Sequence, residues 1–203
     1  TGSSNTSVGK NSSDAITEGD NNTAIGDGAL SATTTSDANT ALGTQALKLN
    51  ITGANNAAVG FQALYANTTG GANVSVGNYA LDANTTASNN TAVGYASLGA
   101  NTEGTGNTAM GLSTLGACTT GDFNVAVGNN ALDANVTGDN NTALGYSALG
   151  TTTVSDHTAF GFKALEATTT GTANTAVGRH CLVQNTTGVN NVGVGYNTLA
   201  ANT

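Results

Sequence analysis

The hydrophobic and polar positions of this chain repeat with a period of 17 residues. A glycine marks the period, and every step between successive marks is 17 residues except the step from 145 to 161, which is 16. We call these residues the anchor glycines: Gly9, Gly26, Gly43, Gly60, Gly77, Gly94, Gly111, Gly128, Gly145, Gly161, Gly178 and Gly195. Twelve copies in one register predict a single repeat array over residues 1–203, in which each copy forms one structural unit.

Each position around the anchor glycine has its own chemical character. The residue before it is large and apolar in all twelve copies, and the residue four after it is Leu in eleven. The residue two before it is Ala in nine copies, and the residue four before it is Asn in eleven, with His157 as the exception. The segment Asn-Thr-Ala-Val therefore alternates like a β-strand, with Thr and Val on one face and Ala on the other. The glycine permits a sharp bend, and the segment Asn-Thr-Thr-Gly-x-Asn is typical of a turn.

A unit of 17 residues cannot bury its own apolar face, so the copies must stack. We expect an all-β fold, a β-solenoid of twelve 17-residue coils that is roughly 58 Å long at about 4.8 Å per coil. The expected side-chain ladder consists of Asn22, Asn39, Asn56, Asn73, Asn90, Asn107, Asn124, Asn141, Asn174 and Asn191. The expected core consists of Val59, Val76, Val93, Val127, Val177, Leu64, Leu81, Leu98, Leu132 and Leu149.

This core is thin for the number of residues that it must order, because each coil contributes only two large aliphatic side chains. Further burial between chains is therefore expected, and the position two before the anchor glycine, with Ala, Ser or Gly in every copy, suits close approach of a neighbouring chain. We expect a homo-oligomer. Both ends of the sequence fit the same period, which predicts a fragment of a longer array or a unit of a continuous fibre.

Charge and hydropathy exclude two classes of partner. The net charge is −8 and only four residues are Lys or Arg, so no basic surface for nucleic acid is expected. No apolar run approaches the length of a membrane-spanning helix, so no membrane insertion is expected.

Candidates for catalysis are weak. His157 and His180 occupy different positions of the repeat, no carboxylate pair recurs beside them, and no Ser lies in a nucleophile motif. We therefore expect no enzymatic activity and no cofactor. Cys118 and Cys181 lie about four coils apart, too far for a disulfide within the chain. We favour the interpretation that both are small buried side chains, with a disulfide between two chains as the alternative.

Two surface features leave alternatives open. One turn position holds an acidic residue in four copies, where calcium binding is the weaker interpretation and a solvated turn the stronger: Asp20, Asp37, Asp122 and Asp139. An interrupted row of aromatic residues follows the anchor glycine, and packing or chain contact is favoured for it over stacking on sugars: Phe61, Tyr95, Tyr146, Phe162 and Tyr196.

The strings "NTAVGYASLGANTEG", "NTALGYSALGTTT" and "FQALYANTTGGANVSVG" resemble the short repeats of bacteriophage tail fibres. More loosely, they are similar to the head repeats of trimeric autotransporter adhesins of the YadA type. The resemblance covers the whole chain. It implies a trimeric left-handed β-roll or triple β-helix that is exposed on a virion or a bacterial cell surface, with no enzymatic site in the repeats.

The favoured function is a structural fibre or shaft segment that presents a receptor-binding tip for host attachment. Its expected partners are other copies of itself and a carbohydrate or protein receptor on the host surface. One alternative is a subunit of a self-assembling extracellular filament. A second is an ice-binding solenoid with a Thr-rich face, although Ala57, Val74, Val125 and Val192 interrupt the Thr positions of the predicted strands.

Overall fold

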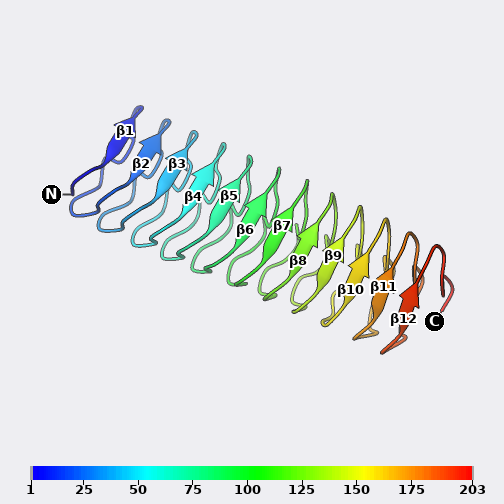
Figure 1. Cartoon of the computed structure of the whole chain (residues 1–203). Helices are drawn as coiled ribbons and strands as arrows, with labels where there is room; N and C mark the ends of the chain where they lie inside the picture. Colours follow the sequence, from blue (N-terminus) through cyan, green and yellow to red (C-terminus); the bar gives the residue numbers. More distant parts are fainter. Residues whose placement is uncertain (1, 203) are drawn as a thin grey trace.

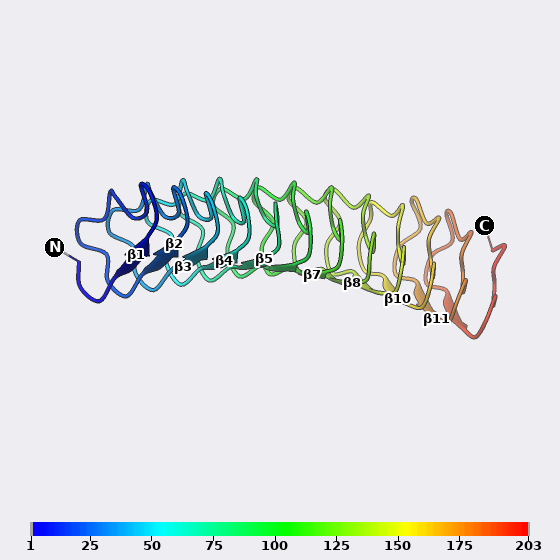
Figure 2. The same ribbon diagram turned by 90° about the horizontal axis from the view of Figure 1, so that it is seen from above.

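The structure, a computed structural model, describes residues 2–202 and is a β-solenoid built from one parallel sheet. Each repeat contributes one strand of three residues, and the strands follow one another in chain order, so that the molecule is a rod with its two termini at opposite ends (Figures 1 and 2). The strands are β1 (Thr6–Val8), β2 (Thr23–Ile25), β3 (Thr40–Leu42), β4 (Ala57–Val59), β5 (Val74–Val76), β6 (Thr91–Val93), β7 (Thr108–Met110), β8 (Val125–Val127), β9 (Thr142–Leu144), β10 (Thr158–Phe160), β11 (Thr175–Val177) and β12 (Val192–Val194). The all-β solenoid expected from the sequence is confirmed.

Equivalent residues of successive coils lie directly over one another. In the pair β6 and β7, Thr91 is opposite Thr108 and Ala92 is opposite Ala109. The single 16-residue coil does not disturb this register, because Thr158 of β10 is still opposite Thr142 of β9. The missing residue is therefore absorbed in the connection between these two strands, where a deletion is tolerated best.

The anchor glycines are required by the closeness of successive coils. Their φ angles lie between +124° and +140°, a region that side chains rarely adopt. A Cβ atom on Gly94 would also overlap the carbonyl oxygen of Gly111 in the next coil. Glycine therefore occurs at this position in all twelve repeats, since any side chain would force the coils apart.

Three further residues of each coil adopt left-handed backbone conformations and make its corners. In the coil that begins at β6 these corners are Ala96 (φ 50°) and Leu98 (φ 51°), and the third corner precedes the strand at Asn89 (φ 63°). The turn at Leu98 brings it and the adjacent residue Ser97 both into the interior, where both are fully buried. This local geometry explains why strict alternation ends after the anchor glycine. The strain of a left-handed Leu is offset by the burial of its side chain.

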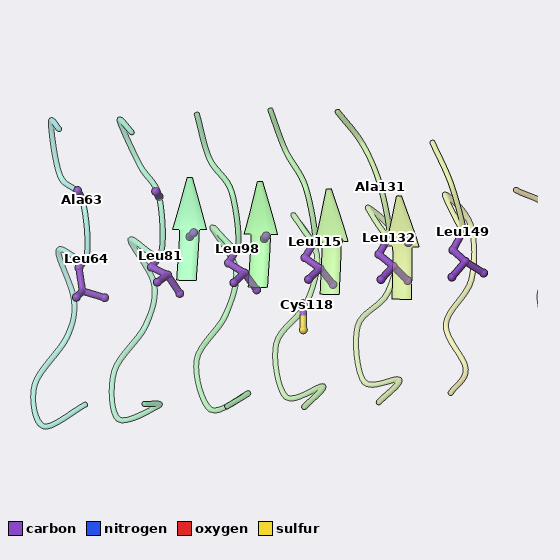
Figure 3. Packing of buried hydrophobic residues seen from close by; sticks show 14 of the residues in the cluster. Ala63, Leu64, Leu81, Leu98, Leu115, Cys118, Ala131, Leu132 and Leu149 are labelled. Atoms are coloured by element: carbon purple, nitrogen blue, oxygen red, sulfur yellow. The ribbon is translucent and has the colours of Figure 1, made fainter. Parts of the chain in front are cut away.

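A single row of leucines runs along the axis and forms the centre of the core (Figure 3). Two rows of small residues flank it: the middle residue of each strand, such as Ala92, and the residue three after the anchor glycine, such as Ala131. The fully buried leucines are Leu30, Leu47, Leu64, Leu81, Leu98, Leu115, Leu132, Leu149, Leu165 and Leu182. The expected Leu half of the core is thus found inside the solenoid.

The Val half of the expected core is wrong for the single chain. The strand side that carries Val points outward: Val76 is 37% exposed and Val177 is 36% exposed, and Val59, Val93 and Val127 are only half-buried. The Ala side, expected to contact neighbouring chains, is instead fully buried inside the coils of β2 to β11.

The reason for this exchange of faces is the narrow cross-section of a coil. Gly193 occupies the Ala position of β12, and a Cβ atom there would lie 2.6 Å from the Sγ of Cys181 and 3.3 Å from the Cδ1 of Leu182. Even a methyl group would clash there, and the Ala or Ser at this position is fully buried in β2 to β11, so the coil has no room for a Val side chain.

Candidate functional sites

The asparagines four before the anchor glycine form a ladder inside the rod, broken once at His157. The Oδ1 of Asn90 accepts a hydrogen bond from the backbone N–H of Asn107 at 2.9 Å, and its Nδ2 donates to the carbonyl oxygen of Gly104 at 2.8 Å. The same backbone contact joins one run of eight ladder residues, Asn22, Asn39, Asn56, Asn73, Asn90, Asn107, Asn124 and Asn141, and a second run of two, Asn174 and Asn191. Each buried amide is thereby satisfied by the next coil, which links coils through side chains as well as through the sheet.

His157 is the one ladder position without Asn, and it completes the ladder only in part. Its backbone N–H donates to the Oδ1 of Asn141 at 3.0 Å, and its Nδ1 accepts from the backbone N–H of Asn174 at a longer 3.3 Å. The side chain is fully buried, and its Nε2 has no hydrogen-bond partner among the described residues. Burial lowers the pKa of His157 below its ordinary value of 6.5. Accepting at Nδ1 requires the neutral ring, so His157 is a structural histidine.

A second buried amide ladder occupies the segment that the sequence pattern assigns to a turn. The Nδ2 of Asn84 donates to the Oδ1 of Asn67 at 2.8 Å and to the carbonyl oxygen of Ala87 at 3.0 Å. The buried members of this ladder are Asn50, Asn67, Asn84, Asn101, Asn135 and Asn185. The signal for it is the Asn seven residues after the anchor glycine, which recurs in seven of twelve copies.

Cys118 interrupts this second ladder. It follows Asn101 in the same row, and the Oδ1 of Asn101 is buried without a hydrogen-bond donor. The Sγ of Cys118 contacts the carbonyl oxygen of Gly121 at 3.6 Å, and burial raises the pKa of its thiol to about 11. Cys181 is also buried and both cysteines are free thiols within the chain. Their burial makes them poor candidates for reactive groups.

The four acidic turn residues act as acceptors for backbone groups of the preceding coil. The Oδ1 of Asp122 accepts the backbone N–H of Thr105 at 2.6 Å, and the Oδ1 of Asp139 accepts that of Asp122 at 2.7 Å. Asp20 and Asp37 make the equivalent contacts one after the other near the N-terminal end. Hydrogen bonding to Ser3 lowers the pKa of Asp20, which keeps this carboxylate ionised. Among residues 2–202, no three His, Cys, Asp or Glu side chains gather as a metal site would require.

The outward side of the strands forms an uncharged strip along the rod, with one apolar row and one row that is Thr in eight of twelve strands, and we call it the outer strand face. It consists of the first and third residues of β1 to β12, and none of these positions holds a charged residue. Large side chains on it are open to solvent, among them Met110 at 42%, Leu144 at 51% and Phe160 at 39% exposure. An apolar surface of this continuity marks a place of contact with another molecule.

The aromatic residues after the anchor glycines gather in two groups on another part of the surface. Phe61, Tyr79 and Tyr95 contact one another edge to face, with ring centroids 5.4 and 5.7 Å apart. In the second group the rings of Tyr146 and Phe162 are stacked at 5.4 Å. Tyr79 and Tyr95 of the first group border a groove.

This groove, of about 680 Å³, crosses the coils that begin at β5 to β8 and is lined entirely by residues that follow those strands. Tyr79 and Tyr95 form one wall, and Asp82 and Asp133 are also part of the lining. Its remaining lining consists of small residues: Ala96, Gly99, Ser113, Gly116, Ala117 and Ala134. No Lys, Arg or His lines it. Sequence reasoning did not find this groove, although the two glycines could have indicated it.

Comparisons with protein families, curated proteins and solved structures find no match to this chain. The resemblance to tail-fibre and adhesin repeats therefore stays a prediction. Over residues 2–202 the structure has no helix that meets the length and apolarity needed to cross a lipid bilayer.

Proposed function

We propose that this chain is a structural shaft segment of a phage tail fibre or bacterial surface adhesin, in which several copies associate through the outer strand face. The observation that carries this proposal is the combination of an uncharged outer strand face, with a large apolar residue at the third position of every strand, and hydrogen-bond ladders that join the coils inside. The function is mechanical: the shaft holds a receptor-binding tip away from the surface that bears it.

Stiffness along the axis follows from how each coil is joined to the next. Coils are connected by the parallel sheet, by the Asn ladder and by backbone contacts outside the strands, such as Leu98 N–H to the carbonyl oxygen of Thr114 at 3.0 Å. Bending the rod would stretch several of these bonds at once. Such a rod suits a spacer better than it suits an enzyme, whose sites depend on loops that vary and move.

Association supplies the burial that a single coil lacks. The interior holds one Leu and small residues per coil, while the larger Val, Met and Phe side chains of the strands remain half-buried or exposed. Packing the outer strand faces of neighbouring chains together would remove this apolar area from water without placing a charge in the contact. The number three is implied by the resemblance to trimeric fibres and adhesins.

Sedimentation velocity of the full chain tests the proposal, and a discrete trimer is the expected result. Replacing Val93 and Met110 by Lys should give monomers, because two buried ammonium groups per chain would enter the contact. The control carries the same two charges on exposed turn residues, Thr86→Lys and Thr120→Lys, and should remain trimeric. A wild-type monomer would contradict the proposal, and open-ended polymers would favour the filament alternative instead. A trimer that tolerates lysines at Val93 and Met110 would also contradict the assigned contact.

A further inference from the structure

We propose that the groove beside Tyr79 and Tyr95 is a binding site for a neutral sugar, with one pyranose ring packed on Tyr95 and its hydroxyl groups bound by Asp82 and Asp133. This activity is separate from the mechanical function of the shaft. It assigns a ligand to one place on the rod, where the repeat pattern is locally altered.

The groove exists because two successive coils have lost a side chain. The position five after the anchor glycine is occupied elsewhere by residues as large as Tyr65, Glu166 and Val183. In the sequence, only one pair of consecutive repeats has glycine at this position in both members, namely Gly99 and Gly116. Neither glycine has a φ angle that requires glycine, so the backbone conformation permits a side chain at both positions once the Asp133 carboxylate moves away from Gly116. The gap is therefore not needed by the fold.

The aromatic wall is held in place before any ligand arrives. Tyr79 is half-buried and lies edge to face between Phe61, at 5.4 Å, and Tyr95, at 5.7 Å. Tyr95 is 55% exposed and offers its ring to the groove. The C–H face of a pyranose is apolar and packs on such a ring, and little side-chain freedom is lost because Tyr79 restrains Tyr95.

The carboxylates reach over the gap from its two ends. The Oδ1 of Asp82 lies 3.4 Å from the place where a Cβ of Gly99 would be, and the Oδ1 of Asp133 lies 2.9 Å from the corresponding place at Gly116. Both side chains are half-buried, and burial raises the pKa of both carboxyl groups. No cation lines the groove to pair with them. Each carboxylate can accept several hydrogen bonds at once, as neighbouring sugar hydroxyls would donate them.

Charge and the available side chains argue against two other kinds of small ligand, acidic sugars and metal ions. Two carboxylates facing one groove repel an acidic sugar, and the net charge of −8 adds to that repulsion. A metal ion would need a third ligand of the usual kind, and none lies close enough among residues 2–202. A volume of about 680 Å³ is within the range of small-molecule sites and leaves room for one or two rings.

The site stays open when chains associate as proposed above. None of its lining residues belongs to a strand, so contacts through the outer strand face do not cover it. Sugar binding and oligomeric state are therefore measured independently, and either can fail without the other.

Saturation-transfer NMR of the full chain with methyl glucoside, methyl galactoside, methyl mannoside, maltose and lactose at millimolar concentration tests the proposal. At least one of these sugars should receive saturation, and sialyllactose should bind more weakly than lactose because of its carboxylate. Tyr95→Ala should weaken binding by roughly tenfold or more, the loss expected for one aromatic contact. Its matched control is Tyr146→Ala, which removes an aromatic residue from the same repeat position outside the groove and should leave binding unchanged.

Filling the gap gives a second, independent variant. Gly99→Val should abolish binding, because it restores a side chain of the kind that Val183 places at this position. Gly150→Val makes the same change at a glycine outside the groove and should bind like the wild type. The proposal is overturned by absence of binding for all five neutral sugars, by preferential binding of sialyllactose, or by equal affinity in each variant and its control. Circular dichroism of every variant confirms that the rod is intact.

Discussion

The interior and the outer strand face are formed by the same three-residue strands, yet they obey different rules. Inside, the middle strand residue is Ala, Ser or Gly in every repeat and is fully buried in β2 to β11. Outside, the third residue varies among Val, Ile, Leu, Met and Phe. The difference teaches that volume, and not hydrophobicity alone, selects the residues of a narrow coil. The larger side chains are outside because only a methyl group fits inside.

The largest effect is expected where two coils approach most closely. Gly94→Ala places a Cβ against the carbonyl oxygen of Gly111 at a φ of +135°, so the free energy of unfolding should fall by more than about 3 kcal/mol. Gly150→Ala is the control, since its φ is ordinary and its nearest neighbour would be the Ser147 carbonyl oxygen at 3.2 Å. Urea unfolding followed by circular dichroism measures both. Equal losses would mean that the close approach of the anchor glycines does not limit the fold.

Substitutions at two neighbouring residues of one strand allow the interior and the outer strand face to be compared directly. Ala92→Val adds two methyl groups to the closed interior and should destabilise the chain by about 1–3 kcal/mol at any protein concentration. Val93→Ala removes a similar volume from the outer strand face. It should cost less at low concentration, where the chains are separate, and more as they associate. Thermal unfolding over a range of concentrations separates the two. A concentration-independent loss for Val93→Ala would contradict association through this face.

The interrupted ladder predicts a gain in stability. Cys118→Asn would provide a donor for the buried Oδ1 of Asn101 and join it to Asn135 in the row beyond. The free energy of unfolding should rise by about 1–2 kcal/mol, measured by urea unfolding under reducing conditions. Cys118→Ser, which is too short to span the row, should gain less. If Cys118→Asn lowered the free energy of unfolding instead, the missing amide at this position would not be what limits stability.

The smallest effect concerns pH. Burial lowers the pKa of His157 below 6.5, so the unfolded chain binds the proton more readily than the folded chain does. Stability from this residue is present above pH 6.5 and is lost as the pH falls below that value. His157→Asn removes this loss and restores the ladder bond to Asn174, with a gain of about 1 kcal/mol. Denaturation at about pH 8 and about pH 5 should show a smaller difference for the variant than for the wild type, and equal differences would exclude His157 as the cause.

Much of the fold can be predicted because each position of the repeat can be compared with the equivalent position in eleven other copies. The period, the strand in each repeat and the Asn ladder follow from that comparison alone. Which face of the strand points inward does not follow from it. Alternation shows only that Val93 shares a side with Thr91, and hydrophobicity alone would place that side inside. The polar Thr on the same side is the feature of the sequence that could have indicated that this side faces outward.

The left-handed conformation of Leu98 could not be predicted, because nothing in the local preference of Leu favours it. It is imposed by the size of the coil and by burial of the side chain. The second amide ladder resembles a turn in sequence for a related reason: Asn is typical of turns, and its burial depends on neighbouring coils. The groove depends on two glycines in adjacent copies, a signal visible only after the repeats are aligned.

Because the anchor glycines stack backbone against backbone, the coils are evenly spaced along the rod. Its spacing of about 4.8 Å per coil is set by the main chain, so surface side chains can change without altering the distance between any two coils. A recognition site created at one coil therefore has a fixed separation from a site created at another. Associated chains would present such sites at defined intervals around and along the fibre, and weak individual contacts would add into strong attachment where the target has matching intervals.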